Sequence, residues 1–445
     1  MPKKIDLLVE SSRRLLRKGA RSHLENLLSK LHPADIAALL GRLNRQERDT
    51  IFAMLPPEVA AKVLVDMDSL LQTKIMEDMP SKELAGVLAH LPADEAVGLV
   101  DNLSEEKREE VLPLIEGREG VSRLMLYEEE TAGRIMTTDY LALPEDLTVE
   151  EAIQKVREAK EKEVFYIYVV DKRNHLVGVT SLRQLILADP DTQLKDVMNP
   201  EVISVKADMD QEEVARIVAR YDILAVPVVD DQNHLIGMVT VDDVINIIQD
   251  EATEDIYKMV GASEEELWEA STLKIAGYRL PWLAFTIVGE MLSGLVIKHY
   301  HHTISTLVSV AFFVPLIMAL SGAVGNQTQT IIVRAMATGR MEGMAWKILR
   351  RQLSVGAIMG LAAGTLACLM VILVQHNHLL GISVGLSLLV SMSISAVIGV
   401  VVPIFSKKVG VDPALTVPSI ATLNDIMGTL IYLSLVTYLL ARTTG

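Results

Sequence analysis

The chain has 445 residues, 50% of them hydrophobic, and a formal net charge of −16. These values exclude one uniform soluble globule, because the charge and the apolar residues must lie in different parts of the chain. From Tyr278 onward, 10 Lys and Arg oppose 4 Asp and Glu, so this part carries about +6 and residues 1–277 carry about −22.

Residues 1–130 are predicted to form a stack of short helices. The N-terminal "MPKKIDLLVESSRRLLRKG" is amphipathic and lacks the apolar core of a signal peptide, so we expect this part in the cytosol. Helix-start residues then recur about every 12 residues, namely Pro33, Asn44, Pro56, Asp68, Pro80, Pro92 and Ser104. Pro at the first helical position and Asn, Asp or Ser at the N-cap are typical of helix starts. Their repetition predicts a helical superhelix.

Residues 131–192 and 193–250 are two copies of one unit. The segment "YIYVVDKRNHLVGVTSLRQLI" (166–186) returns as "LAVPVVDDQNHLIGMVTVDDVI" (224–245). Each copy reads as strand, helix, strand, turn, strand and helix, which predicts a small α/β fold. The pair resembles a tandem of CBS (cystathionine-β-synthase) domains, regulatory modules that often bind adenine nucleotides.

The resemblance to CBS domains implies at most one good nucleotide site, for example for ATP. In that family a Thr or Ser at a helix start and an Asp three residues later contact ribose. Thr240 and Asp243 match in the second copy, whereas the first copy has Ser181 and Gln184. A structural alternative stays open, because Thr240 and Asp243 equally suit an N-cap and an acid in the first helical turn.

Residues 251–277 are predicted to form a helix that connects the CBS pair to the apolar part. Its acids Glu251, Glu254 and Asp255 crowd one or two turns. Such a face is normally solvated. Facing other acids, it would be repelled unless cations intervened.

Residues 278–445 are predicted to form a transmembrane domain of five helices, because a span needs about 20 largely apolar residues. The stretches are 279–298, 303–336, 348–374, 380–405 and 416–440. Basic residues follow the second and fourth stretches, which places those loops and the N-terminal domains in the cytosol and the C-terminus outside. We therefore expect a multi-pass protein of the cell (inner) membrane. The single cysteine, Cys368, excludes an internal disulfide.

Small and polar residues mark particular faces of these spans. A glycine face (Gly356, Gly360, Gly364) and a face of Ser387, Ser391, Ser395 and Gly399 predict close helix packing. In the second span, Pro315 and "SGAVGNQTQT" (321–330) are expected to interrupt the helix. Polar, broken backbone at membrane depth is tolerated only where it is buried in protein or faces water.

Asp425, in "ATLNDIMGTLIYL", is an acid in an otherwise apolar span. An Asp at the centre of a span costs roughly 2.5–3.5 kcal/mol, so it usually faces a cavity or a partner. One reading is a protonated carboxyl group bonded to a neighbouring helix, and the other is a cation site. Mg²⁺ suits the second, because it keeps several waters and uses one or two carboxylates. Glu290, the other intramembrane acid, either lines the same pathway or only hydrogen-bonds.

The strings "GNQTQTIIVRAMATG", "GVDPAL", "ATLNDIMG" and "DEATEDIY" and the order of the parts resemble the MgtE family of magnesium channels over essentially the whole chain. The resemblance implies a multidomain α plus α/β fold: helical superhelix, tandem CBS pair, connecting plug helix and five-helix transmembrane domain. It implies a homodimer in the lipid bilayer, with the pore on the two-fold axis.

The same resemblance assigns residues. It implies Asp425 as the ion-selectivity residue, Asn326 and Gly325 near the pore, and a broken second helix over 315–330. Mg²⁺ is then both the transported and the regulatory ion. The implied regulatory acids are Asp94, Glu95, Asp222, Asp243, Glu251, Glu254 and Asp255. Two departures are Asn246, where another acid is expected, and Ala323, where Gly or Asn is expected.

The resulting hypothesis is a Mg²⁺-selective channel for magnesium uptake that internal Mg²⁺ closes. The alternative is a transporter of another divalent cation such as Co²⁺, or an exporter, on the same architecture. A membrane-anchored nucleotide sensor is a third class. No nucleophile–base pair indicates an enzyme, and no nucleic-acid partner is expected. A last group of residues either binds a transition metal or is simply solvated: His299, His301, His302, His376 and His378.

Overall fold

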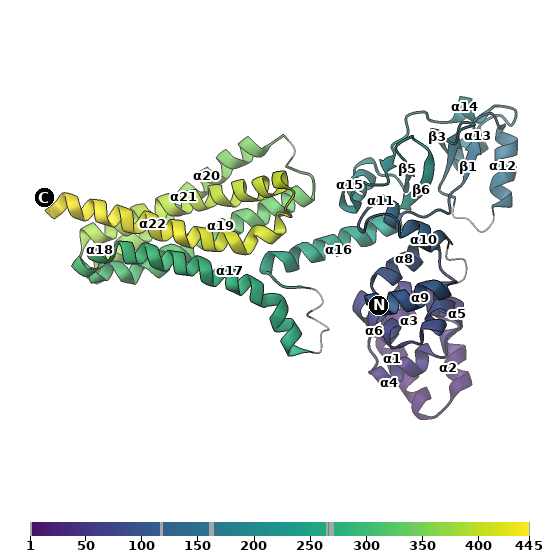
Figure 1. Cartoon of the computed structure of the whole chain (residues 1–445), viewed down its shortest axis with the longest axis horizontal. Helices are drawn as coiled ribbons and strands as arrows, with labels where there is room; N and C mark the ends of the chain where they lie inside the picture. The colour runs from purple at the N-terminus through teal and green to yellow at the C-terminus, as the bar shows by residue number, and fades with distance from the viewer. Residues whose placement is uncertain are drawn as a thin grey trace. The chain divides into compact units, whose positions relative to one another are not determined.

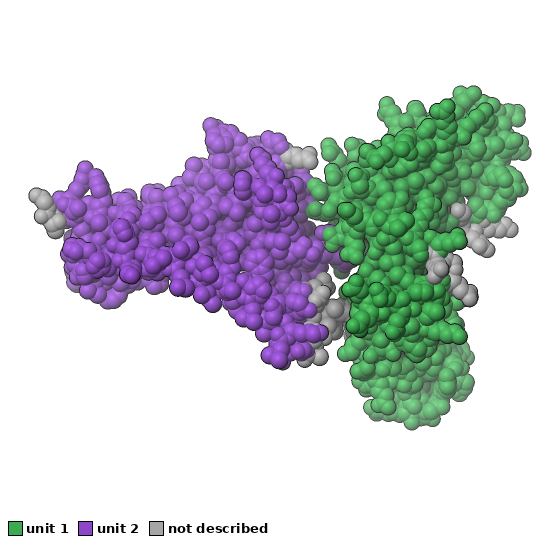
Figure 2. Space-filling view, in the orientation of Figure 1, with its two compact units in different colours: residues 1–249 green, residues 250–445 purple. Residues whose placement is uncertain are grey.

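The computed structural model describes residues 2–115, 119–159, 164–263, 266, 271–341 and 343–444. The chain forms two compact units, residues 1–249 and 250–445 (Figure 2). The first unit holds a helical stack and two small sheets, and the second holds long apolar helices (Figure 1). The predicted fold class is confirmed: a helical N-terminal region, a CBS-like pair and five apolar helices follow one another.

Ten short helices form the N-terminal stack. They are α1 (Pro2–Arg17), α2 (Arg21–Leu28), α3 (Pro33–Leu40), α4 (Arg45–Phe52), α5 (Pro57–Val65), α6 (Ser69–Asp78), α7 (Ser81–Leu88), α8 (Ala93–Asp101), α9 (Glu105–Val111) and α10 (Glu119–Leu124). A short 3₁₀ turn, Leu112–Leu114, follows α9. One apolar core, including Ile36, Leu64 and Leu88, joins α1 to α9, whereas α10 packs with part of α8 in a second core that includes residues of the second copy of the duplicated unit. No single helix buries its apolar face alone, which is why the helices stack.

The helix starts lie within one residue of the predicted positions. Asn44 accepts a hydrogen bond from the Glu47 backbone N–H at 2.9 Å and forms a capping box with it. Pro33 is the first helical residue, as predicted, but Pro56, Pro80 and Pro92 are N-caps and each helix begins one residue later. The extended backbone at these prolines suits an N-cap, which lies outside the helical conformation.

Two three-stranded sheets form the CBS-like pair. The first copy contains β1 (Ala142–Pro144), α12 (Val149–Glu158), β2 (Tyr166–Val170), β3 (Leu176–Ser181) and α13 (Leu182–Leu187). The second contains β4 (Val205–Lys206), α15 (Gln211–Tyr221), β5 (Ala225–Val229), β6 (Leu235–Thr240) and α16 (Val241–Val260), and the short helices α11 (Ala132–Ile135) and α14 (Leu194–Val197) precede the copies. In each sheet the first two strands are parallel and the last two antiparallel. The predicted internal duplication is therefore present.

The two copies meet at their equivalent hairpin turns. Leu176 N donates to Asn233 O at 3.0 Å, and Leu235 N donates to Asn174 O at 3.2 Å. The rings of His175 and His234 stack between the turns with centroids 4.7 Å apart. Each turn thus satisfies backbone groups of the other copy.

Long apolar helices make up the second unit and run side by side (Figure 1). They are α17 (Thr272–His299), α19 (Val314–Ala337), α20 (Ala345–Gln375), α21 (His378–Val409) and α22 (Val417–Thr444), with the short α18 (His301–Thr306) and 3₁₀ turns Val308–Phe313 and Ala414–Thr416 between them. Five segments in the described part of the chain have the length and composition to cross a membrane. They match the five predicted spans.

The expected break in the second span is wrong. α19 is one continuous helix from Val314 to Ala337, so the predicted interruption over 315–330 is absent. Pro315 lies in the first turn, where its missing N–H leaves no helical hydrogen bond unmade. Gly322 and Gly325 keep helical backbone angles and serve close packing instead of a kink.

Glycines bring α20 and α21 into backbone contact, as the small-residue face predicts. A Cβ atom at Gly360 would lie 2.8 Å from Leu389 Cα, and one at Gly364 would lie 2.5 Å from Gly385 O. On α21, Gly399 packs in the same way against Gly325 O at 2.8 Å. α21 therefore lies between α20 and α19 with a glycine contact on each side.

Candidate ion pathway and regulatory sites

Asp425 lies half-buried on α22, between α17 and α19. A Cβ atom at Gly322 of α19 would lie 3.7 Å from Asp425 Oδ1, so α19 offers bare backbone to this carboxyl group. On the other side, Gly289 of α17, the neighbour of Glu290, packs against Thr422 of α22, about one helical turn before Asp425. The structure thus brings the two intramembrane acids of the predicted spans together.

The polar residues of α19 divide between two faces. Gly325 is buried, where a Cβ atom would lie 1.9 Å from Asn424 Nδ2 of α22. Asn326 is exposed and lies one helical turn beyond Gly322, on the face that meets Asp425. Ala323 is also exposed. Of the predicted pore residues, Asp425 and Asn326 therefore share one face, and Gly325 packs the helices.

Two amides that sequence reasoning did not single out lie on the two helices that meet at Gly322 and Asp425. Gln329 of α19 and Asn424 of α22 are completely buried, and none of their four amide N and O atoms has a hydrogen-bond partner among the described residues. Buried amides without partners usually contact water or an ion. The sequence could have indicated them, because Gln329 lies in the polar string "GNQTQT" and Asn424 lies next to Asp425 in "LNDIMG".

An acidic cluster forms in the first unit where α8 faces the start of α16. Asp94 and Glu95 lie in the first turn of α8, and Asp242 and Asp243 in that of α16. Burial raises the pKa of Glu95 to about 7, and the negative charges of its neighbours add to the rise. Burial raises the pKa of Asp243 to about 6, with Asp242 and Asp94 contributing. Three predicted regulatory acids are thus brought together.

One direct observation supports a cation site at this cluster. Asp94 Oδ1 is buried and has no hydrogen-bond partner in the described part of the chain, although burial raises the pKa of this carboxyl group. Crowded, desolvated carboxylates are stabilised by a bound cation. Nevertheless, no three His, Cys, Asp or Glu side chains among the described residues converge into a ready cage. A cation bound by these acids would need water molecules to complete its coordination shell, and Mg²⁺ usually keeps several bound waters.

Other predicted acids lie elsewhere. Asp222 is the exposed C-cap of α15, with a left-handed backbone (φ 51°), and is not among the charges that shift the pKa of Glu95 or Asp243. Asn246 is exposed on α16. Thr240 donates its hydroxyl hydrogen to Asp243, so the two residues assigned to ribose contact each other. Thr240 and Asp243 therefore lie at the start of α16, within the acidic cluster.

In the second unit, the end of α16 contacts the loop that precedes α22. Lys258 Nζ lies 2.7 Å from Glu254 Oε1 and 3.0 Å from Asp412 Oδ2. Burial alone would lower the pKa of Lys258, but these two carboxylates outweigh it and raise the pKa. Burial raises the pKa of Asp255, and Asp412 adds to the rise. The acids of the connecting helix therefore do face another acid, and Lys258, which we had not predicted, lies between them.

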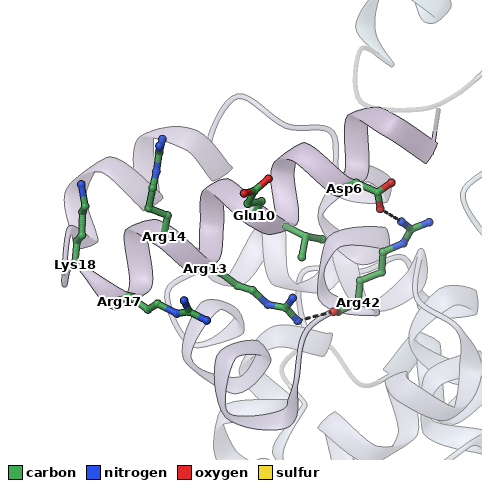
Figure 3. Close-up of a pocket in the computed structure, with 8 residues that line it drawn as sticks. Asp6, Glu10, Arg13, Arg14, Arg17, Lys18 and Arg42 are labelled. Atoms are coloured by element: carbon green, nitrogen blue, oxygen red, sulfur yellow. Dashed lines mark hydrogen bonds and ion pairs between the residues drawn. The ribbon is translucent and has the colours of Figure 1, made fainter.

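Two other features carry no cation site. The five histidines named above are not part of any metal-binding group within the described ranges. A surface cavity of about 740 Å³ lies along α1 (Figure 3). Arg42 pairs with Asp6, and Arg13 with Glu47 at 3.0 Å, while Arg14 is exposed. Because more basic than acidic side chains line this cavity, it does not suit a cation.

Family comparisons cover nearly the whole chain. A family model described as a divalent cation transporter matches residues 314–435, one described as the MgtE intracellular N domain matches 31–130, and CBS domains match 132–191 and 194–250. Among curated relatives, the magnesium transporter MgtE of Thermus thermophilus is 38% identical over 97% of this chain and 98% of its own length. That of Bacillus subtilis is 36% identical over 71% of both chains.

Solved structures agree with these matches for the soluble part. The soluble part of a magnesium transporter is 33% identical, with a TM-score of 0.50 over 56% of this chain and 99% of its own. The cytosolic domain of the Mg²⁺ channel MgtE in complex with ATP is 37% identical, with a TM-score of 0.51 over 54% and 99%. These relatives are transporters, which confirms the prediction that the chain is not an enzyme. The chain belongs to the MgtE family of divalent cation transporters.

Proposed function

We propose that this chain is a Mg²⁺-selective channel for magnesium uptake that closes when internal Mg²⁺ binds its acidic cytosolic sites. The observation that carries the proposal is Asp425, a half-buried carboxyl group in an apolar span that faces the bare backbone of Gly322 and follows Asn424, whose buried amide has no hydrogen-bond partner among the described residues. A carboxylate in such a place supplies the negative charge that selects a cation, and a hydrated Mg²⁺ needs few protein ligands. Relatives named as magnesium transporters support the choice of ion.

A homodimer completes this proposal. Apolar side chains are exposed on equivalent helices of the two CBS copies: Ile186 and Leu187 on α13, and Ile245 and Ile248 on α16. Exposed apolar residues of this kind are typical of protein interfaces. Two Asp425 carboxylates facing one two-fold axis would then hold one hydrated ion. Mass photometry of the detergent-solubilised protein tests the stoichiometry, and a monomer at working concentrations contradicts it.

Regulation by Mg²⁺ follows from the charges of the cytosolic part. Residues 1–277 carry about −22, and Asp94, Glu95 and Asp243 are already crowded within one chain. A cation that binds the compact arrangement preferentially shifts the population toward it. The helix α16 begins at this cluster and its last turn contacts the loop before α22 through Lys258, so closure is proposed to act through it. High internal Mg²⁺ would then shut the pathway and depletion would open it.

Ion flux into liposomes tests the pore assignment. Purified wild-type protein should take up Mg²⁺ in preference to Ca²⁺, Co²⁺ and K⁺, and Asp425→Ala should abolish uptake while the protein remains folded. Leu423→Ala is the control, because it shortens an exposed, uncharged side chain on the same helix. Full uptake by Asp425→Ala contradicts the assignment. A preference for Co²⁺ favours the alternative transporter.

A further inference from the structure

The first 50 residues carry a charge opposite to that of the rest of the soluble part. Within residues 1–50, 11 Lys and Arg oppose 6 Asp and Glu, which gives +5, whereas residues 1–277 together carry about −22. Residues 51–277 therefore carry about −27. A basic surface on an otherwise acidic protein indicates a site for an anion, because its field concentrates negatively charged ligands.

The surface cavity of about 740 Å³ lies within this basic segment, along one face of α1 (Figure 3). Of the eight described residues that line it, five are basic: Arg13, Arg14, Arg17, Lys18 and Arg42. The other three are Asp6, Val9 and Glu10. Small-molecule sites usually measure about 300–1,000 Å³. The cavity is therefore large enough for an anion of several groups.

Two of the basic residues are already paired and fix one wall of the cavity. Arg42 forms an ion pair with Asp6, and Arg13 Nε lies 3.0 Å from Glu47 Oε2. Arg13 Nη2 also donates a hydrogen bond to Arg42 O at 3.2 Å. Charge-assisted hydrogen bonds of this kind orient the guanidinium groups. This wall is therefore held in place, and its charge is largely compensated.

The other three basic residues, Arg14, Arg17 and Lys18, have no hydrogen bond or ion pair in the described part of the chain. All three are exposed, and their spacing of three and four residues places them on neighbouring positions of the helix surface. Glu10 is the remaining acid of the lining, so these four groups sum to +2. An anion in the cavity would supply the missing negative charge.

The lining also indicates the kind of anion. Among the described residues that form it, Val9 is the only apolar one and none is aromatic, so neither a nucleobase nor an acyl chain finds an apolar wall. Arginine side chains suit phosphate, because the planar guanidinium group binds two of its oxygens at once. Figure 3 shows the side chains of Arg14 and Lys18 directed away from that of Arg17, so a single phosphate group cannot contact all three. A chain of phosphate groups can.

We propose that this cavity is a binding site for an inorganic oligophosphate chain, which Arg14, Arg17 and Lys18 contact and which the wall of Arg13 and Arg42 bounds. The site is separate from the acidic cluster and from the CBS pair. The alternative is that the basic residues are only solvated, because Arg14 and Arg17 lie in the last turn of α1 and complement its negative end. That alternative explains neither the cavity nor the basic residues outside this turn, and it predicts no ligand.

Titration of tripolyphosphate into the full-length protein tests the site. The protein is held in phosphatidylcholine nanodiscs, and binding is followed by calorimetry in buffer without Mg²⁺, because tripolyphosphate chelates this ion. The binding-site variant combines Arg14→Gln, Arg17→Gln and Lys18→Gln. The control variant removes the same charge from exposed lysines on α5, α6 and α7, namely Lys62→Gln, Lys74→Gln and Lys82→Gln. Size-exclusion chromatography and circular dichroism establish that both variants are folded.

We expect the control variant to bind tripolyphosphate within about threefold of the wild type, and the binding-site variant to bind it at least about tenfold more weakly. Orthophosphate should bind the wild type at least about tenfold more weakly than tripolyphosphate, because it reaches fewer of the basic groups. Equal affinity of all three proteins, equal affinity for the two anions, or no binding by the wild type overturns the proposal. Binding that disappears in nanodiscs containing phosphatidylglycerol also overturns it, since the basic face then belongs to the lipid surface.

Discussion

Lys258 of α16 and Asp412 of the α21–α22 loop form an ion pair, with Nζ and Oδ2 3.0 Å apart, that ties the connecting helix to the base of α22. The same ammonium contacts Glu254 at 2.7 Å, so one built-in cation neutralises acids on both sides of this contact. A part of the charge compensation expected from Mg²⁺ is therefore already present in the chain.

Removing this cation should weaken closure. In Lys258→Met, the carboxylates of Glu254, Asp255 and Asp412 face one another without compensation, so the end of α16 should leave the loop more readily. We expect the channel to stay open at internal Mg²⁺ concentrations that half-close the wild type. Patch recordings with stepped internal Mg²⁺ measure this shift. Lys258→Arg, which keeps the charge, is the control, and an unchanged inhibition curve for Lys258→Met would exclude a role in gating.

The acidic cluster predicts an unusual dependence of stability on pH for residues 1–249. Folding raises the pKa of Glu95 to about 7 and of Asp243 to about 6, so the folded unit binds more protons than the unfolded chain between roughly pH 4 and 7. The stability that these bound protons contribute is fully present below the pKa values of the unfolded chain. It is lost as the pH rises through the pKa values of Glu95 and Asp243 in the folded unit. In Mg²⁺-free buffer, the unfolding temperature should therefore fall from about pH 5.5 to about pH 8.

Adding Mg²⁺ should raise that unfolding temperature more at the higher pH, where the carboxylates are ionised. The soluble part of a relative has been solved alone, so the measurement on residues 1–249 is practicable. Glu95→Gln should reduce both the pH effect and the Mg²⁺ effect, whereas Glu105→Gln on α9 should leave both unchanged. Equal responses of the two variants would contradict a cation site at the cluster.

Nucleotide binding at the second CBS copy depends on Asp243. If Asp243 contacts ribose, Asp243→Asn should weaken ATP binding about tenfold or more, whereas loss of a capping interaction would lower stability by roughly 1 kcal/mol and leave ATP affinity alone. Calorimetric titration with ATP, together with thermal unfolding, distinguishes the two. Asp242→Asn is the control, because it removes the same charge from the exposed residue that precedes Asp243. The nucleotide assignment is withdrawn if the wild type itself binds no ATP.

Asn326 should line the wet face of the pathway. Asn326→Leu replaces an exposed amide on the Asp425 face of α19 with an apolar side chain and should reduce Mg²⁺ uptake several-fold. A cysteine at 326 should react with water-soluble thiol reagents once Cys368 has been replaced. Ile331→Cys, also exposed on α19, serves as the comparison. A cysteine at 326 that stays unreactive in both high and low Mg²⁺ would show that this stretch is buried packing.

The glycine contact between α20 and α21 should be sensitive to a single methyl group. A Cβ atom at Gly364 would lie 2.5 Å from Gly385 O, so Gly364→Ala forces backbone apart and should cost about 1–3 kcal/mol of stability. Gly294→Ala on α17 meets no atom within 4 Å and should be nearly neutral. Thermal unfolding in detergent measures both, and equal midpoints would mean that the helices do not pack this closely.

Local patterns were sufficient to predict much of this structure. Caps such as Asn44 and the repeated strand–turn–strand strings act over a few residues, so helix starts and the duplicated fold could be read directly. The break at Pro315 was mispredicted because a proline reads the same at the start of a helix and in its middle. The Lys258–Asp412 pair links positions 154 residues apart, and no periodicity encodes such a contact. Glu290 could be recognised in the sequence as an intramembrane acid, but its position near Asp425 depends on how α17 packs against α22.

The crossed hairpin turns of the CBS pair leave neither copy able to stand alone. Tyr168 and Leu176 from one copy and Ala225 and Met238 from the other share a single buried cluster. Separating the two copies would expose this cluster to water. The backbone groups that now form hydrogen bonds with Asn174 and Asn233 would lose these partners. The two copies of the repeated sequence therefore form one cooperative folding unit. A destabilising substitution in the shared core of the first copy should lower the stability of the second copy as well.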